Sequence, residues 1–570
     1  MKSLLRIILV FAGAILFSSC SKSNDEGKMI PKDAMFIAFL NTKSLLDKVS
    51  WDDVKQTSWY KQLYADTSMK PWVKKMLDNP DNSGIDIKAG IAFFVQKGTG
   101  NDYHIVLEGK LSDEKNFEQF NQNFAAPATV VKDGDVSMLT LKEQGVVGWS
   151  DKHFAYVSNS SSYASKYASQ WDTLDNQANM APAAGNTAGL SAYCKGLFSI
   201  KSDSSLSKNE KFSNLLSEKG DIHGWINSEE IMHNGPALGM LGMLKLDIFF
   251  KDNISTYTVD FDNGKIDINQ KAYAGKEFLD FLKKYKGGSI NTNMIANIPS
   301  QNIVGILAMN YKPEAIKEFI KLLGMDGMLN NYINEMGFNI DDFVKANNGD
   351  LLLAVTDLRM KSDSFNYKDD QGNNTSSTVY SRPDANYLFS VGIGDRQSFQ
   401  KLVEAGKKLS SGMGGSIDNK VAFNLNDKTF AIGNQQPFVN QYLGGGNNKF
   451  DFVDKINGKP IGLYVDIQKI LSTFNTDTMM IKDEDARTIM TESLKIWNKV
   501  YSTGGEFDND AMVGHTEISL VDQSTNSLKQ LNHYFDEVAK VMLAKMEREK
   551  SQSNQTDSLM MPPPIDTIGK

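Results

Sequence analysis

Side chains that could perform acid–base, nucleophilic or metal chemistry are widely separated along this chain of 570 residues. Its six histidines form no HExxH pattern and no Cys/His spacing of a zinc site. Cys194 has no histidine close to it in the sequence, so a thiolate nucleophile there would need a base that only the fold could supply. The sequence contains no GxSxG nucleophile elbow, no P-loop and no kinase signature. We therefore predict no catalytic residue, no bound metal and no cofactor.

Carboxylate chemistry is harder to judge from a sequence. Glycoside hydrolysis needs two carboxylates that come together only in the fold, and the chain has 69 acidic residues. A hydrolase of polysaccharide or peptidoglycan is therefore our alternative to a non-catalytic protein. A cleft with two facing carboxylates would favour it.

Five aromatic side chains are candidate ligand contacts. Trp51, Trp59 and Trp72 lie in an early region with a helical pattern, where they could form a platform for sugar stacking. Packing in the core is the simpler interpretation, and we favour it because aromatic side chains dominate burial energetics. Tyr367 and Tyr380 lie in residues 357–386, a polar loop insertion that either contacts a partner or is mobile.

The N-terminus carries a targeting signal. Lys2 and Arg6 precede an apolar stretch that ends in the sequence Phe-Ser-Ser-Cys at residues 17–20. Small residues before a lone Cys resemble the bacterial lipobox, which implies removal of residues 1–19 and diacylation of Cys20, including palmitate. An ordinary secretory signal is the alternative. We expect residues 20–29 to be a lipidated tether, and no later segment is long and apolar enough to span a bilayer.

Composition excludes one class of partner. The net charge of −8 lacks the basic footprint of a nucleic-acid binder, so we predict no nucleic-acid partner. Hydrophobic residues at 41% and charged residues at 23% are typical of a globular protein with a sizeable core.

The elements that position these residues occur twice along the chain. An apolar run at residues 36–41 ends in Asn, as does a second run at residues 303–310, and each follows an Ile-Pro pair. Strand-like and helix-like patterns then follow in the same order after both runs. We predict an α+β fold with two tandem copies of one mixed antiparallel-sheet and helix domain, at residues 30–290 and 291–548.

The end of the chain is expected to be a disordered tail at residues 549–570, which contains three consecutive prolines. Asp-Ser/Thr-aliphatic triplets resemble an acceptor for O-glycosylation in Bacteroidota. Their hydroxyl residues are Thr173, Thr478, Ser558 and Thr567.

The lipobox, the opening Ile-Pro-Lys-Asp-Ala at residues 30–34 and the Gly-Ile-Asp-Ile at residues 84–87 together resemble a Bacteroidota lipoprotein family, the domain of unknown function 4836 type. The resemblance implies an envelope lipoprotein of uncharacterised role and supplies no catalytic residue. We therefore expect an outer-membrane lipoprotein, on the periplasmic face or the cell surface. Its membrane partner is reached through the N-terminal lipid, and its function is non-catalytic binding or assembly of a glycan or an envelope protein.

Overall fold

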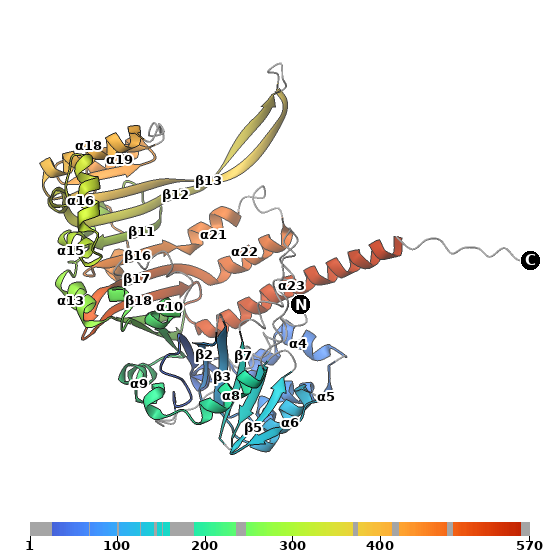
Figure 1. Cartoon of the computed structure of the whole chain (residues 1–570). Helices are drawn as coiled ribbons and strands as arrows, with labels where there is room; N and C mark the ends of the chain where they lie inside the picture. Colours follow the sequence, from blue (N-terminus) through green and yellow to red (C-terminus); the bar gives the residue numbers. More distant parts are fainter. Residues whose placement is uncertain are drawn as a thin grey trace, which may run out of the picture.

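The computed structural model describes residues 26–559 except 68, 100–101, 126, 142–144, 151, 160–186, 235–246, 369–373, 413–420 and 476–482. Its strands pair side by side into one antiparallel sheet with helices on both faces, which confirms the α+β class (Figure 1). No helix in the part of the chain that the structure describes is long and apolar enough to cross a membrane.

The first half of the sheet contains strands β1 to β10. In order across the sheet they are β4 (Val131–Asp133), β5 (Val136–Leu141), β6 (Gly145–Trp149), β7 (His153–Asn159), β3 (Tyr103–Lys110), β2 (Ile91–Lys97), β1 (Phe36–Leu40), β8 (Ile222–Asn227), β9 (Ile254–Asp262) and β10 (Lys265–Tyr273).

The second half contains strands β11 to β18 in an equivalent order. Across the sheet they are β14 (Ala422–Leu425), β15 (Thr429–Gly433), β13 (Asn374–Ile393), β12 (Asn347–Lys368), β11 (Ile303–Asn310), β16 (Ile461–Asp466), β17 (Trp497–Asp508) and β18 (Ala511–Leu520). Across the sheet, each of these strands corresponds in position to one strand of the first half. The corresponding first-half strands are, in the same order, β6, β7, β3, β2, β1, β8, β9 and β10. The strands that the matched sequence patterns predicted therefore occupy equivalent places in the two halves.

The two halves join edge to edge at what we call the seam. Strand β10 pairs with β18 in antiparallel register, from Lys265 opposite Ser519 to Tyr273 opposite Ala511. Strands β10 and β18 each stand at the end of their own half, so the two runs of strands continue into one another at the seam. Each half thereby protects the other's last strand, whose edge would otherwise expose unpaired backbone groups.

One face of the sheet carries the main hydrophobic core of each half. We call it the helix-covered face, although helices also lie on the opposite face. In the first half α8 (Thr187–Phe198) and α9 (Glu210–Ser217) pack on Phe94 and Trp225. In the second half α14 (Thr292–Ala296), α19 (Gln436–Leu443) and α20 (Val453–Ile456) pack on Leu352 and Tyr464. These strands bury alternate residues on this face, as the period of two requires.

The opposite face is covered at the seam by α2 (Thr42–Lys48) and the long helix α23 (Ser527–Leu559), which pack on residues such as Phe261 and Leu520. The remaining α-helices of the described residues are α3 (Trp51–Lys55), α4 (Ser58–Ala65), α5 (Pro71–Asp78), α6 (Glu114–Ala125), α10 (Ser228–Asn234), α12 (Asp247–Phe250), α13 (Lys276–Lys284), α15 (Glu314–Leu322), α16 (Asp326–Glu335), α17 (Ile340–Ala346), α18 (Arg396–Gly412), α21 (Ile467–Asn475) and α22 (Glu484–Ile496). Short 3₁₀ turns occur at Pro80–Ser83, Ser202–Ser204 and Leu206–Lys208.

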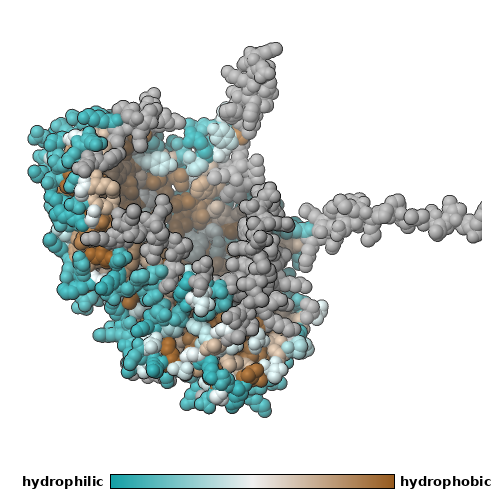
Figure 2. Space-filling model, viewed as in Figure 1, coloured by the Kyte–Doolittle hydropathy of each residue, from teal (hydrophilic) through white to brown (hydrophobic). Residues whose placement is uncertain are grey.

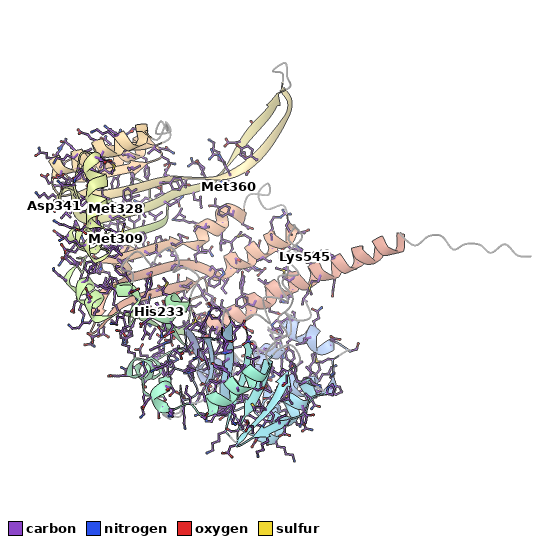
Figure 3. The ribbon with its side chains drawn as sticks, viewed as in Figure 1. His233, Met309, Met328, Asp341, Met360 and Lys545 are labelled. Atoms are coloured by element: carbon purple, nitrogen blue, oxygen red, sulfur yellow. The ribbon has the colours of Figure 1, made fainter. Side chains whose placement is uncertain are left out.

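The insertion at residues 357–386, predicted as a loop, is largely a two-stranded ribbon that continues β12 and β13 beyond the sheet (Figure 1). Met360, labelled in Figure 3, lies opposite Pro383 where the ribbon leaves the sheet. Ion pairs connect its strands, from Arg359 to Asp384 and from Arg382 to Asp363. A ribbon with solvent on both faces needs no apolar alternation, which is why its sequence is typical of a loop.

The expected tail boundary at residue 549 also needs correction, because α23 extends to Leu559. Lys545 and Arg548 pair with Asp483 and Asp485 at the start of α22, which supports the helix up to this point. Lys545 is labelled on α23 in Figure 3. The first proline after this helix is Pro562, so no helix breaker stands at the expected boundary.

Candidate functional site

A polar groove crosses the seam on the helix-covered face, between the core helices of the two halves. Its volume is about 620 Å³, and its floor is formed by β9, β10, β18 and β17. We call it the seam groove and define it by Lys219, Asp260, Asp267, Asn269, Thr503 and His515. Both halves contribute to it, so it exists only when the two halves are joined.

The strand register explains why this strip of the sheet is polar. Trp225 of the first core lies opposite Thr256 on β9, and Tyr464 of the second core lies opposite Tyr501 on β17. The strands between these two pairs continue the same face of the sheet. On β9 the residues that point to this face are Thr256, Thr258 and Asp260. The helix-covered face therefore changes from apolar to polar at the seam.

Two buried carboxylates lie side by side on the floor of this groove. Asp260 on β9 lies directly opposite Asp267 on β10, and the two residues are only 5% and 8% exposed. Lys219 lies 3.3 Å from Asp260, and Lys265 lies 2.6 Å from Asp267. His515 Nε2 lies 3.2 Å from the same Asp267 carboxylate. These contacts compensate two like charges that would otherwise repel each other.

Two lysines along the groove, Lys265 and Lys271, are held in their charged form. The hydrogen bond to Asp267 raises the pKa of Lys265, and the hydrogen bond to Glu218 raises the pKa of Lys271. Lys271 lies 2.6 Å from Glu218. The groove thus presents ammonium and carboxylate groups in fixed, alternating positions.

A second depression has the opposite character and lies on the other face of the sheet. We call it the open apolar face and define it by Leu307, Leu353, Val355, Tyr387, Phe389 and Leu463, on strands β11, β12, β13 and β16. Its volume is about 540 Å³. Leu353 is 42% exposed and Tyr387 is 51% exposed. Figure 2 shows brown, hydrophobic residues lining a hollow around these strands.

The sequence of β12 indicates how this face arises. The run at residues 351–355 is apolar at every position, which is typical of a strand buried on both faces. In the structure Leu352 and Ala354 are buried in the second core, whereas Leu353 points to the open apolar face. The side chains needed for a buried strand are present, but one face of the strand is left accessible.

The three tryptophans do not form a common platform. Trp51 donates from Nε1 to the carbonyl of Leu77 at 2.9 Å, and both Trp51 and Trp59 pack edge-on against Tyr60. Trp72 packs against aromatic residues of α6 instead, with ring centroids 5.7 Å from Phe120. Trp51 and Trp59 are half-buried against the apolar cluster around Tyr60, and Trp72 is half-buried against α6.

The remaining candidates from the sequence are two tyrosines of the insertion, the lipidation site and the possible O-glycosylation residues. Tyr380 is exposed on the ribbon, and Tyr367 lies in β12 with its side chain outside the described residues. Ser558 lies in α23, also with its side chain outside the described residues. The structure does not describe Cys20, Thr173, Thr478 or Thr567.

Two buried titratable groups belong to neither depression. Burial raises the pKa of the Cys194 thiol to about 12, so the thiol is protonated at neutral pH and is a poor nucleophile. Burial also raises the pKa of Glu108 to about 7, against the lowering effect of Lys110, and the nearby Glu26 raises it further. We did not predict Glu108 as an unusual group, although it is an acidic residue within an otherwise apolar stretch of β3.

The chain is similar to a protein family over most of its length. Residues 27–379 match the model of a family described as a domain of unknown function (DUF4836), which is more than half of the chain. The matched region covers the first half and continues into the ribbon of the second. No curated protein and no solved structure matches the chain.

Proposed function

We propose that this chain, which belongs to the DUF4836 family of unknown function, is a lipid-anchored, non-catalytic binding protein of the cell envelope. The anchor rests on the lipobox-like sequence that ends at Cys20. Met29 and Ile30 are already buried in the first core. Eight residues, 21–28, separate Cys20 from Met29, a reach of at most about 30 Å, which would hold the body close to the membrane.

The observation that carries the binding role is the open apolar face. Monomeric soluble proteins rarely expose large contiguous apolar patches, and such patches mark sites that bind other molecules. A volume of about 540 Å³ is within the usual range for a ligand pocket. The exposed positions of Leu353 and Tyr387 are therefore accounted for by a bound apolar ligand.

The chemistry of this face favours a long acyl chain. Strands β16, β11, β12, β13 and β15 are each paired on both sides, so no peptide strand could add to any of them. Among the described residues its lining includes no charged side chain. A ligand at this face must therefore gain its affinity from apolar contact, and an acyl chain loses no hydrogen bond on entering it.

Displacement of a fluorescent fatty acid, cis-parinaric acid, by palmitate tests this proposal on protein from which residues 1–20 are removed. Leu353→Asp should weaken binding at least tenfold, because it places a charge in the apolar contact. Val131→Asp is the matched control, since Val131 is a 60% exposed apolar residue on β4 far along the sheet. Absence of displaceable binding, or equal binding by both variants, would exclude the acyl-chain site.

The anchor and its compartment have their own tests. Labelled palmitate should be incorporated into the wild-type protein and not into Cys20→Ala, which should move to the soluble fraction. Incorporation into the variant would contradict lipidation at Cys20. Protease digestion of intact cells, with lysed cells as control, then separates the cell surface from the periplasmic face of the outer membrane.

A second candidate function is hydrolysis of polysaccharide or peptidoglycan. It is favoured by one observation, the register pair Asp260 and Asp267 in the seam groove, since glycosidases use two facing carboxylates. Release of reducing ends by the wild-type protein, lost in Asp267→Asn with the fold retained, would support it. No release by the wild-type protein would leave the groove without this function.

A further inference from the structure

We propose that the seam groove is a second binding site, which takes a neutral oligosaccharide. The proposal is independent of the acyl-chain site, because the groove lies on the helix-covered face and the open apolar face lies on the other side of the sheet. The groove crosses from β9 in the first half to β17 in the second. An extended chain of sugar units is the shape of ligand that would contact both halves at once.

The balance of charge along the groove argues against a charged ligand. Five carboxylates and four lysines line it, and they are interleaved rather than separated into two patches. Ion pairs connect Lys219 to Asp260, Lys265 to Asp267 and Lys459 to Glu506. Because the two signs nearly balance, the field of the groove gives little preference to a ligand of either sign.

A hydroxyl group, in contrast, can join these pairs without breaking them. A carboxylate has about four acceptor positions and an ammonium has three donor protons, so each keeps free capacity after forming one ion pair. A sugar hydroxyl both donates and accepts, and it can therefore bridge the Asp267 carboxylate and the Lys265 ammonium. Neutral groups on the same floor, Asn269 and Thr503, add further donors and acceptors.

The burial of the two aspartates suggests that these positions are kept for a ligand. Asp260 and Asp267 are nearly buried and directly opposite each other, an arrangement that costs desolvation and repulsion. Departures from the rules of stable packing tend to occur at functional sites. Lys219, Lys265 and His515 also fix the orientation of the two carboxylates, so a ligand would order few side chains on binding.

Recognition in this groove would depend on hydrogen bonds. None of the described residues that line it is a phenylalanine, tyrosine or tryptophan, so the large rings on which sugars commonly stack are not part of it. Strands β9, β10, β18 and β17 are paired on both sides, which excludes a peptide bound by strand addition. Binding should accordingly have a favourable enthalpy.

The test is isothermal titration calorimetry of chitohexaose, mannohexaose and xylohexaose with the protein from residue 21 onward. We expect one of the three to bind, and Asn269→Ala to raise its Kd at least tenfold. Asn269 is exposed on the groove floor, so its replacement leaves the ion pairs and the core intact. Thr503→Val should weaken the same ligand from the other half.

Two controls keep the result interpretable. Asn116→Ala changes an exposed asparagine on α6 and should leave the Kd unchanged. Leu353→Asp, which should abolish acyl-chain binding, should also leave glycan binding unchanged, so that the two proposals fail or succeed separately. No binding of any of the three hexasaccharides, or a Kd that neither Asn269→Ala nor Thr503→Val alters, would overturn the proposal.

Discussion

The carboxylate of Asp536 on α23 accepts hydrogen bonds from the backbone N–H of Ser58 at 2.5 Å and from its hydroxyl at 3.2 Å. Ser58 is the first residue of α4, and the N-cap Thr57 makes no side-chain cap of its own. A helix that follows the last strand of the second half therefore caps a helix of the first. A negative charge at a helix N-terminus is favourable, and this one is almost fully buried.

Replacing Asp536 by Ala should lower the free energy of unfolding by about 1–3 kcal/mol, since it removes a helix cap and a charged hydrogen bond. Urea denaturation monitored by circular dichroism measures this change. Glu547→Ala, at an exposed position further along α23, is the control and should be close to neutral. Equal stability of the two variants would show that the cap contributes nothing.

A second buried carboxylate connects distant segments of the first half. Asp221 is fully buried and accepts from the Ser44 hydroxyl at 2.5 Å, the Lys48 ammonium at 2.5 Å and the Phe261 backbone N–H at 2.7 Å. Asp221→Ala should cost about 3–5 kcal/mol, because Lys48 then loses its buried partner.

The double variant Asp221→Ala with Lys48→Met checks this explanation. It should be less destabilised than the sum of the two single variants, since the second change removes the charge that the first left unpaired. Thermal unfolding of all four proteins gives the coupling energy. Strictly additive effects would mean that the ion pair makes no contribution of its own.

The ribbon should be dispensable for folding. Between Arg359 and Asp384 its two strands pair only with each other, and its ion pairs are exposed, so each is worth about 0–1 kcal/mol. Replacing residues 359–384 by Asn-Gly should change stability by less than about 1 kcal/mol. Leu352→Ala, in the buried part of β12, should cost about 2–5 kcal/mol in a parallel denaturation experiment. A large loss on deletion would mean that the ribbon contacts the body.

Local patterns in the sequence predicted the fold class and several of the strands. The apolar runs at residues 36–41 and 303–310 are strands β1 and β11, and each lies between equivalent neighbours. These strands could be recognised because alternation and bounding Pro and Asn residues are local signals. The α+β class followed from the mixture of such strands with helical patterns.

The seam and both depressions could not be predicted in the same way. The pairing of β10 with β18 joins residues about 250 positions apart, and no local signal specifies it. The alternation of Thr256, Thr258 and Asp260 is that of a strand with one solvated face, and only the neighbouring helices turn that face into a groove. The apolar run in β12 predicts burial on both faces, so the sequence could not show that one face of this strand is accessible.

The stability of the protein should depend on pH through Glu108. This side chain is 8% exposed on β3, between Ala92 on β2 and Ala155 on β7. Burial raises its pKa from the ordinary value of 4.5 to about 7. Between these values the folded protein keeps a proton that the unfolded chain has lost, so the free energy of unfolding should fall as the pH rises through this window.

Glu108→Gln removes that titration and should stabilise the protein above pH 7, by on the order of 3 kcal/mol relative to wild type, with little difference below pH 4.5. Denaturation midpoints measured from pH 4 to 8 give the difference between the two proteins at each pH. Glu549→Gln, an exposed change near the end of α23, should follow the wild-type curve. Glu26→Gln should shift the transition of Glu108 to lower pH, because Glu26 contributes to the raised pKa of Glu108. A wild-type and Glu108→Gln difference that does not change with pH would show that Glu108 titrates as an ordinary carboxyl group.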